Sequence, residues 1–200
     1  MKVNAFDVPT FCKDVLQVYD ERLIRFAQEV GEIRTVKKGE CVIKQGDVPT
    51  HTFFLIDGIF RGYLSSPEGK EMTDCFAFQP GSTVMPSSDI NKPAPVSLEA
   101  VTDAHILSFP NSEIYPRIWE YPELQKLYIR LLLSSYNSHW ELKTIHYQYD
   151  AMERYKWFCK TYPELLSHVK DKDIASFLNM TPITLSRLKQ ALRERQKVLR

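Results

Sequence analysis

Residues 172–192 read KDIASFLNMTPITLSRLKQAL, a pattern that predicts two helices joined by a tight turn. Asn179 stands in the three-residue break between them, and asparagine tolerates the left-handed backbone that such a turn requires. Thr181 is expected to cap the second helix, with Pro182 at its first helical position. The expected apolar faces are Ile174, Ala175, Phe177 and Leu178 on the first helix and Leu185, Leu188 and Leu192 on the second. This order of elements is the helix-turn-helix layout.

The outer face of the second helix carries groups suited to duplex DNA. Its first-turn N–H groups and the hydroxyls of Thr181 and Thr184 can donate to phosphate oxygens. The planar guanidinium of Arg187 can read a base edge and prefers guanine. Lys172 and Lys189 would attract phosphates whatever the base sequence. The predicted DNA-binding residues are Lys172, Thr181, Pro182, Ile183, Thr184, Ser186, Arg187, Lys189 and Gln190.

Charge is distributed unevenly along the chain. Residues 1–152 hold 15 Lys and Arg against 20 Asp and Glu, a net charge of −5, whereas residues 153–200 hold 11 against 5, a net charge of +6. A basic segment on an acidic body is expected when one end of a protein meets a polyanion. The alternative is an ordinary helical hairpin whose basic side chains serve only solubility.

Glycine marks a different kind of structure earlier in the chain. All seven glycines lie between positions 31 and 81, where they separate short β-prone runs. Such spacing is typical of strands joined by tight turns. The expected strands cover residues 40–44, 52–56, 59–64, 71–78, 96–101 and 105–109. They predict an antiparallel barrel or roll from about residue 33 to 110, preceded by a helix over 14–30.

A long helix is expected to begin at Pro122, where the missing N–H costs nothing. Along this segment, a stripe of residues repeats about every 3.6 positions, which is the helical period. The stripe consists of Leu124, Leu127, Leu131, Ser134, Ser138, Leu142, Ile145 and Tyr149. A helix of this length either packs in a core or pairs with a second copy of itself. Asp150 and Glu153 form a capping-box pattern, which starts another helix through about Lys160.

Composition excludes several classes of protein. With 26% charged and 44% apolar residues, the 200-residue chain is not a wholly disordered one. No stretch approaches the roughly 18 apolar residues that cross a bilayer, and the first residues lack a secretory pattern, so we expect a cytoplasmic protein without a membrane partner. The spacing of Cys12, Cys41, Cys75 and Cys159 matches no zinc or redox motif, which favours free thiols and no metal or cofactor.

On these motifs the chain resembles the Crp–Fnr family of bacterial transcription regulators over nearly its whole length. Residues 36–72, VKKGECVIKQGDVPTHTFFLIDGIFRGYLSSPEGKEM, resemble the start of that family's cyclic-nucleotide-binding β-roll. Residues 153–166 and 172–189 resemble its DNA-binding domain. The resemblance implies an α+β protein, its β-roll being a double-stranded β-helix. The implied domains are a β-roll sensor over 1–121, a dimerisation helix over 122–149 and a helix-turn-helix domain over 150–200.

The resemblance implies a homodimer that regulates transcription by binding a palindromic operator in double-stranded DNA, and that is not an enzyme. It leaves room for RNA polymerase and for an unidentified small-molecule effector as further partners. A remote alternative is a cupin-like β-barrel enzyme. That alternative would need clustered metal ligands, which the isolated His51 and His105 do not supply.

The chain departs from the family at the nucleotide pocket. The Gly-Glu pair that holds ribose is replaced by Met85 and Pro86, and the Arg-Ser-Ala that holds the cyclic phosphate is replaced by residues 94–96, Ala-Pro-Val. A buried phosphate needs a cation or several N–H donors, so cyclic AMP is not the expected effector. The β-roll then binds another small ligand or is purely structural. Candidate effector contacts are Arg61, Met85, Ala94, His139 and Trp140, although the last two could instead pack at a dimer seam.

Overall fold

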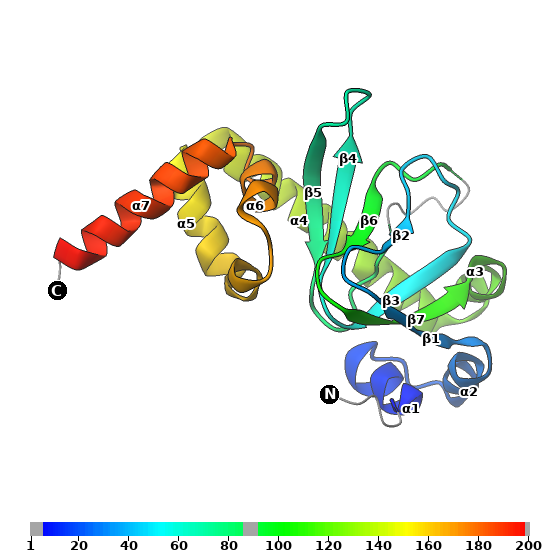
Figure 1. Ribbon diagram of the computed structural model, residues 1–200. Helices are drawn as coiled ribbons and strands as arrows, with labels where there is room; N and C mark the ends of the chain where they lie inside the picture. Colours follow the sequence, from blue (N-terminus) through cyan, green and yellow to red (C-terminus); the bar gives the residue numbers. More distant parts are fainter. Residues whose placement is uncertain (1–5, 86–91, 199–200) are drawn as a thin grey trace. The chain divides into compact units, whose positions relative to one another are not determined.

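The computed structural model describes residues 6–85 and 92–198, with side chains as far as residue 194 (Figure 1). The chain divides into two compact units. The first comprises Met1–Gly62 and Phe76–Ser135, and the second comprises Tyr63–Cys75 and Tyr136–Arg200. The outer part of one β-hairpin therefore belongs to the same unit as the C-terminal helices.

Within the described residues, seven strands form the β-roll. Their bounds are β1 Glu32–Val36, β2 Cys41–Ile43, β3 His51–Asp57, β4 Phe60–Ser65, β5 Glu71–Ala77, β6 Ser97–Ala100 and β7 Ala104–Pro110. One sheet has the order β1-β7-β3 and the other has the order β2-β6-β4-β5. The pairs of β7 with β1 and β3, and of β2 with β6, are antiparallel. The predicted antiparallel roll and α+β class are confirmed, and β1 is a strand that the sequence did not predict separately.

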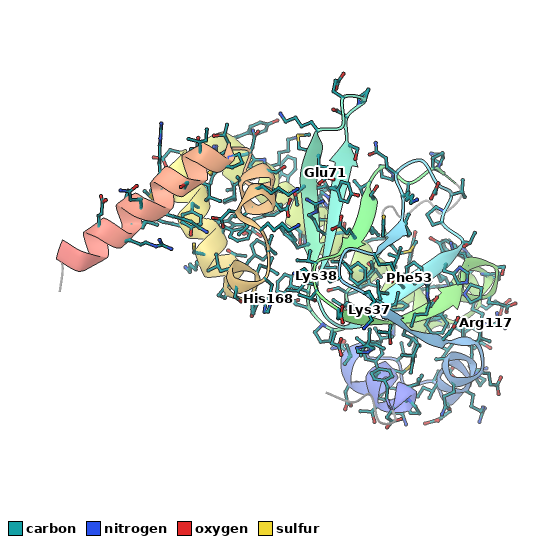
Figure 2. The ribbon with its side chains drawn as sticks, viewed as in Figure 1. Lys37, Lys38, Phe53, Glu71, Arg117 and His168 are labelled. Carbon is teal, nitrogen blue, oxygen red and sulfur yellow. The ribbon has the colours of Figure 1, made fainter. Side chains whose placement is uncertain are left out.

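Tight turns close this roll where the sequence carries glycine. Gly58 joins β3 to β4 at a φ of +97°, and a Cβ at this position would lie 2.4 Å from that of Ala104. Only glycine fits such a turn. The carboxylate of Asp103 binds the ammonium of Lys37 at 3.1 Å and the N–H of Lys38 at 2.9 Å, which fixes the turn after β1. Lys37 and Lys38 are labelled in Figure 2.

The N-terminal segment differs from its prediction. Its elements are α1 Val8–Thr10, a π-helical turn Phe11–Val15 and α2 Glu21–Val30. A single helix over 14–30 is wrong, because Gln17 has a φ of +55° and ends the helical path. The chain re-enters a helix at Asp20, whose carboxylate accepts the N–H of Arg22 at 2.9 Å.

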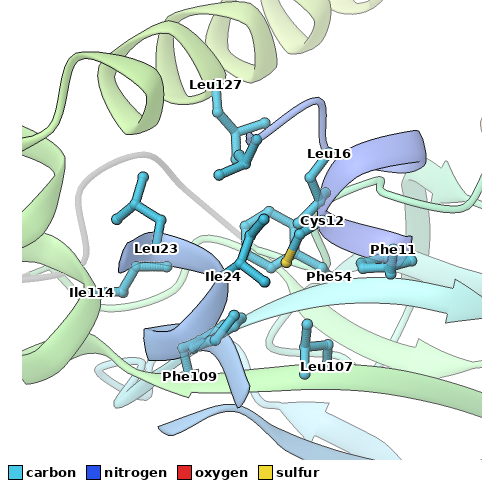
Figure 3. Close-up of a cluster of buried hydrophobic side chains, with 12 residues drawn as sticks. Phe11, Cys12, Leu16, Leu23, Ile24, Phe54, Leu107, Phe109, Ile114 and Leu127 are labelled. Carbon is cyan, nitrogen blue, oxygen red and sulfur yellow. The ribbon is translucent and has the colours of Figure 1, made fainter. Parts of the chain in front are cut away.

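A hydrophobic core joins these N-terminal helices to the sheet and to two later helices, α3 Asn111–Glu120 and α4 Pro122–Gln148 (Figure 3). Phe54 from β3 and Phe109 from β7 meet edge to face with ring centroids 6.0 Å apart. Cys12 is buried in the same cluster, and this burial raises the pKa of its thiol to about 11. Cys12 is thus a packed apolar residue.

The remaining elements lie after α4. They are α5 Ala151–Thr161, a 3-10 helix Pro163–Ser167, α6 Asp171–Phe177 and α7 Pro182–Val198. The long helix expected over 122–149 is confirmed, and so is the capping box of Asp150 and Glu153, in which each side chain accepts the other residue's N–H. Among the described residues, no helix is long and apolar enough to cross a membrane.

Candidate nucleic-acid interface

α6 and α7 pack through the apolar faces that the sequence predicts. The four apolar residues of the first face are all buried, and Leu185 from α7 is buried beside them. Leu188 and Leu192 are partly buried. Phe177 also contacts α5, where the ring of Phe158 lies 5.8 Å away in an edge-to-face arrangement. This small core fixes the angle at which α7 leaves the turn.

The turn between α6 and α7 has the predicted conformation. Asn179 adopts a φ of +51°, and the N–H of Met180 reaches back to the carbonyl of Ala175 at 2.9 Å. The Thr181 hydroxyl then accepts the N–H of Thr184 at 3.1 Å, which caps α7 immediately before Pro182. The predicted helix-turn-helix geometry is therefore present.

One side of α7 is turned to solvent. Ile183, Ser186, Arg187 and Gln190 are all exposed and follow one another at three- and four-residue spacing, so they lie on one face of the helix. Ile183 is the most apolar of them and is 66% exposed. Lys172, in the first turn of α6, is exposed as well.

Several of the predicted DNA-binding side chains already have partners. Lys189 is ion-paired with Asp171. Gln190 donates its amide to the carboxylate of Glu194 at 2.9 Å. The hydroxyls of Thr181 and Thr184 bond each other at 2.9 Å. Among the side chains that the structure describes, none forms a hydrogen bond or ion pair with Arg187, and this guanidinium can reach an external acceptor without breaking a contact.

Three of the predicted effector residues lie in the first unit. Arg61 is buried, with 4% of its surface exposed, and pairs with Glu99 at 3.5 Å. Ala94 is buried too, and its N–H donates to the carbonyl of Asp47 at 2.7 Å. Met85 is partly buried, while its predicted neighbour Pro86 lies outside the described residues.

The other two predicted effector residues lie in the second unit, on α4. The Nε2 atom of His139 lies 3.5 Å from the carboxylate of Asp74 on β5. Trp140 is exposed, and the ammonium of Lys143 lies 5.0 Å from the centroid of its ring. The five residues thus divide between the two units, and their role in binding an effector stays a prediction.

Residues 33–117 match the family model of the cyclic nucleotide-binding domain. A comparison with curated proteins finds no match. Among solved structures, FixK2 from Bradyrhizobium japonicum superposes with a TM-score of 0.75 at 17% identity, over 84% of this chain and 86% of that one. CLP from Xanthomonas campestris, a c-di-GMP responsive global regulator, gives 0.72 at 14% identity over 89% and 93%. A protein from Eubacterium rectale assigned to the Crp/Fnr family gives 0.69 at 15% identity over 88% and 85%.

The chain has the Crp–Fnr fold. The resemblance identified in the motifs of the sequence is therefore confirmed at the level of the fold. The family model matches the β-roll, whose strands are joined by turns that contain glycine. The likeness to the solved structures extends over the helices that follow the β-roll.

Sequence reasoning missed one set of contacts in this Crp–Fnr fold. Within the second unit, the N–H of Thr73 on β5 donates to the hydroxyl of Ser176 on α6 at 2.9 Å. The Nε2 atom of His146 on α4 lies 3.1 Å from the carbonyl of Phe177, and burial lowers the pKa of this imidazole. No local pattern marks a contact between residues so far apart in the chain. These two hydrogen bonds join α6, the first helix of the helix-turn-helix, to β5 and to α4.

The β-roll also holds a cavity of about 140 Å³ beside β2 and β3, lined by residues 42–43, 47–51 and 53. None of the five predicted effector residues lines it. Over the described parts of the chain, no three His, Cys, Asp or Glu side chains are grouped so that they could hold a metal ion.

Proposed function

We propose that the protein is a dimeric, sequence-specific DNA-binding regulator of transcription. The observation that carries this proposal is the outer face of the capped helix α7, where Arg187 is exposed and has no partner among the described side chains. The Crp–Fnr fold supports the same role, since the solved structures that share it include regulators.

The proposed interface follows from the direction of α7. Its N-terminal turn would enter the major groove, where the positive end of the helix dipole faces a phosphate. Arg187 stands about one and a half turns into the helix and can place its two-pronged guanidinium on the O6 and N7 atoms of a guanine. Lys172 at the start of α6 would bind the phosphate backbone.

Dimerisation is proposed to use one face of α4. Ile129, Leu133, Tyr136 and Trp140 are each more than half exposed and recur at four-, three- and four-residue spacing. This is a single apolar stripe of the kind through which two helices pair. The stripe predicted from the sequence lies on the opposite side of the helix, where Leu127 and Ile145 are buried within the chain itself. A two-fold dimer would bind a palindromic operator whose half-sites are one turn, roughly 34 Å, apart.

The β-roll is not expected to hold a cyclic nucleotide through the usual contacts. The N–H of Ala94 is taken by Asp47, the carbonyl of Ala94 by Gly46, and the buried guanidinium of Arg61 by Glu99. A phosphate that bound there would have to displace these partners, and the protein would lose the hydrogen bonds that they make. The β-roll therefore serves a different small-molecule effector or acts as a structural module, and RNA polymerase stays a predicted partner. No enzymatic activity is proposed, and a role on DNA fits the predicted cytoplasmic location.

The proposal is tested by measuring binding to a DNA site selected from random sequences. We expect Arg187→Ala to lose about 1–3 kcal/mol on that site and to relax base choice at one position of each half-site, because the bidentate contact to guanine is gone. Arg25→Ala removes the same group from the exposed face of α2 and should leave binding unchanged. If Arg187→Ala weakened every sequence equally, Arg187 would be a phosphate contact and would carry no base reading.

A further inference from the structure

The first turn of α7 presents an apolar side chain to solvent. Ile183 is 66% exposed, whereas Leu185, Leu188 and Leu192 on the same helix are buried or partly buried. A large exposed apolar residue on the proposed DNA-facing side contributes nothing to attraction for phosphate. Its apolar surface instead matches the 5-methyl group of thymine, the one apolar feature that the major groove displays.

The position of Ile183 relative to Arg187 fits this assignment. The two residues are four apart on one face, which separates them by about 6 Å along the helix axis. Successive bases on a strand are about 3.4 Å apart, so the two side chains would reach positions about two steps apart. The base that Ile183 contacts would therefore lie in the same half-site as the guanine that Arg187 contacts.

Neighbouring side chains on α7 are less suited to reading a base. The Thr181 and Thr184 hydroxyls are bonded to each other, and Lys189 is held by Asp171. Residues 182–192 contain no carboxylate that could accept the N4 amine of cytosine. Gln190, on the same face, could read adenine, but its amide is bonded to the carboxylate of Glu194. On the exposed face, Ile183 and Arg187 are therefore the side chains whose base preferences are available without breaking a contact.

We propose that Ile183 is a specificity-determining residue that packs on the methyl group of a thymine in each operator half-site, close to the guanine read by Arg187. This inference rests on the proposed function and adds the chemistry of a second base position. Because Ile183 is exposed, its replacement by alanine removes the contact without opening a cavity in the fold.

The test replaces each thymine of the selected site in turn by deoxyuridine, which lacks only the methyl group. The dissociation constant is measured for the wild type and for Ile183→Ala at one salt concentration. We expect each half-site to contain one thymine whose replacement by deoxyuridine weakens DNA binding by the wild type about four-fold. On the thymine site, Ile183→Ala should bind more weakly than the wild type by at least the same factor. Replacing that thymine by deoxyuridine should not weaken the variant any further, since the two changes remove one contact.

Ile33→Ala, which removes an exposed isoleucine from β1, should respond to deoxyuridine as the wild type does. The inference is overturned if no deoxyuridine weakens the wild type, or if Ile183→Ala and deoxyuridine weaken binding independently. Ile183 would then contact the phosphate backbone, or a protein partner if its replacement leaves DNA binding intact. Failure of the proposed function looks different, because selection would then recover no site that the wild type binds better than random DNA.

Discussion

Lys172 and Arg187 are both exposed cations of the helix-turn-helix, and they lie on different helices. Arg187 lies on the outer face of α7, whereas Lys172 lies in the first turn of α6. In a helix-turn-helix the first helix crosses the DNA backbone and the second enters the groove. One cation is therefore expected to read a base, and the other is expected to bind phosphate only.

This difference predicts that Lys172→Ala weakens binding to the selected site and to random DNA by similar factors. It should also make the slope of log K against log salt shallower by about one, because one fewer counterion is released. The slope is obtained from titrations at several salt concentrations, with Lys126→Ala on α4 as the matched control. An unchanged slope would remove Lys172 from the interface.

Among the elements, α4 has two apolar sides that differ in their exposure to solvent. The side that the sequence predicts packs within the chain near both ends of the helix, through Leu127 and Ile145. The opposite side carries the exposed stripe described above. Its apolar area stays in water unless a second helix covers it.

We therefore expect Leu133→Glu to give a monomer, since a charge in the centre of a helix pair would be buried without a partner. Sedimentation equilibrium should show the mass of two chains for the wild type and of one chain for this variant. Ser138→Glu adds the same charge to an exposed position on the opposite side of α4 and should stay dimeric. A dimeric Leu133→Glu protein would place the interface elsewhere.

The elements that the sequence predicts well depend on local chemistry. The capping box of Asp150 and Glu153, the left-handed Asn179 and the Thr181 cap each involve residues within a few positions of one another. The end of the helical path at Gln17 was not predicted, because the side chain that stabilises the segment after it comes from a distant part of the sequence. The Glu123 carboxylate accepts the N–H groups of Tyr19 and Asp20 at 2.7 and 2.9 Å, across more than a hundred residues.

The same distinction separates the two predicted sites. Every side chain predicted to bind DNA lies on or beside one helix-turn-helix, so local periodicity alone places these residues together. The predicted effector residues come from β4, from the segments around Met85 and Ala94, and from α4. Their mutual arrangement depends on tertiary packing that no periodicity encodes, and the contact of Thr73 with Ser176 escaped prediction for the same reason.

At the scale of the whole molecule, the Crp–Fnr fold joins a β-roll to a helix-turn-helix through α4. Each part on its own has an ordinary structural explanation, such as a sheet domain, a long core helix or a basic hairpin. The proposed function would account for the presence of a basic C-terminal segment, an apolar stripe on α4 and an acidic remainder in one chain. An effector of the β-roll could act only through a difference in its affinity for two arrangements of these parts.

Selection of bound fragments from random-sequence DNA by the purified protein at near-physiological salt tests most directly whether the protein is a dimeric, sequence-specific regulator. It is run with and without a low-molecular-mass extract of the source cells, so that a required effector is supplied. We predict enrichment of a two-fold symmetric motif with half-sites roughly 34 Å apart, each containing a guanine under Arg187. Recovery of no motif under either condition, or of one without symmetry, would contradict the account of a dimeric, sequence-specific regulator.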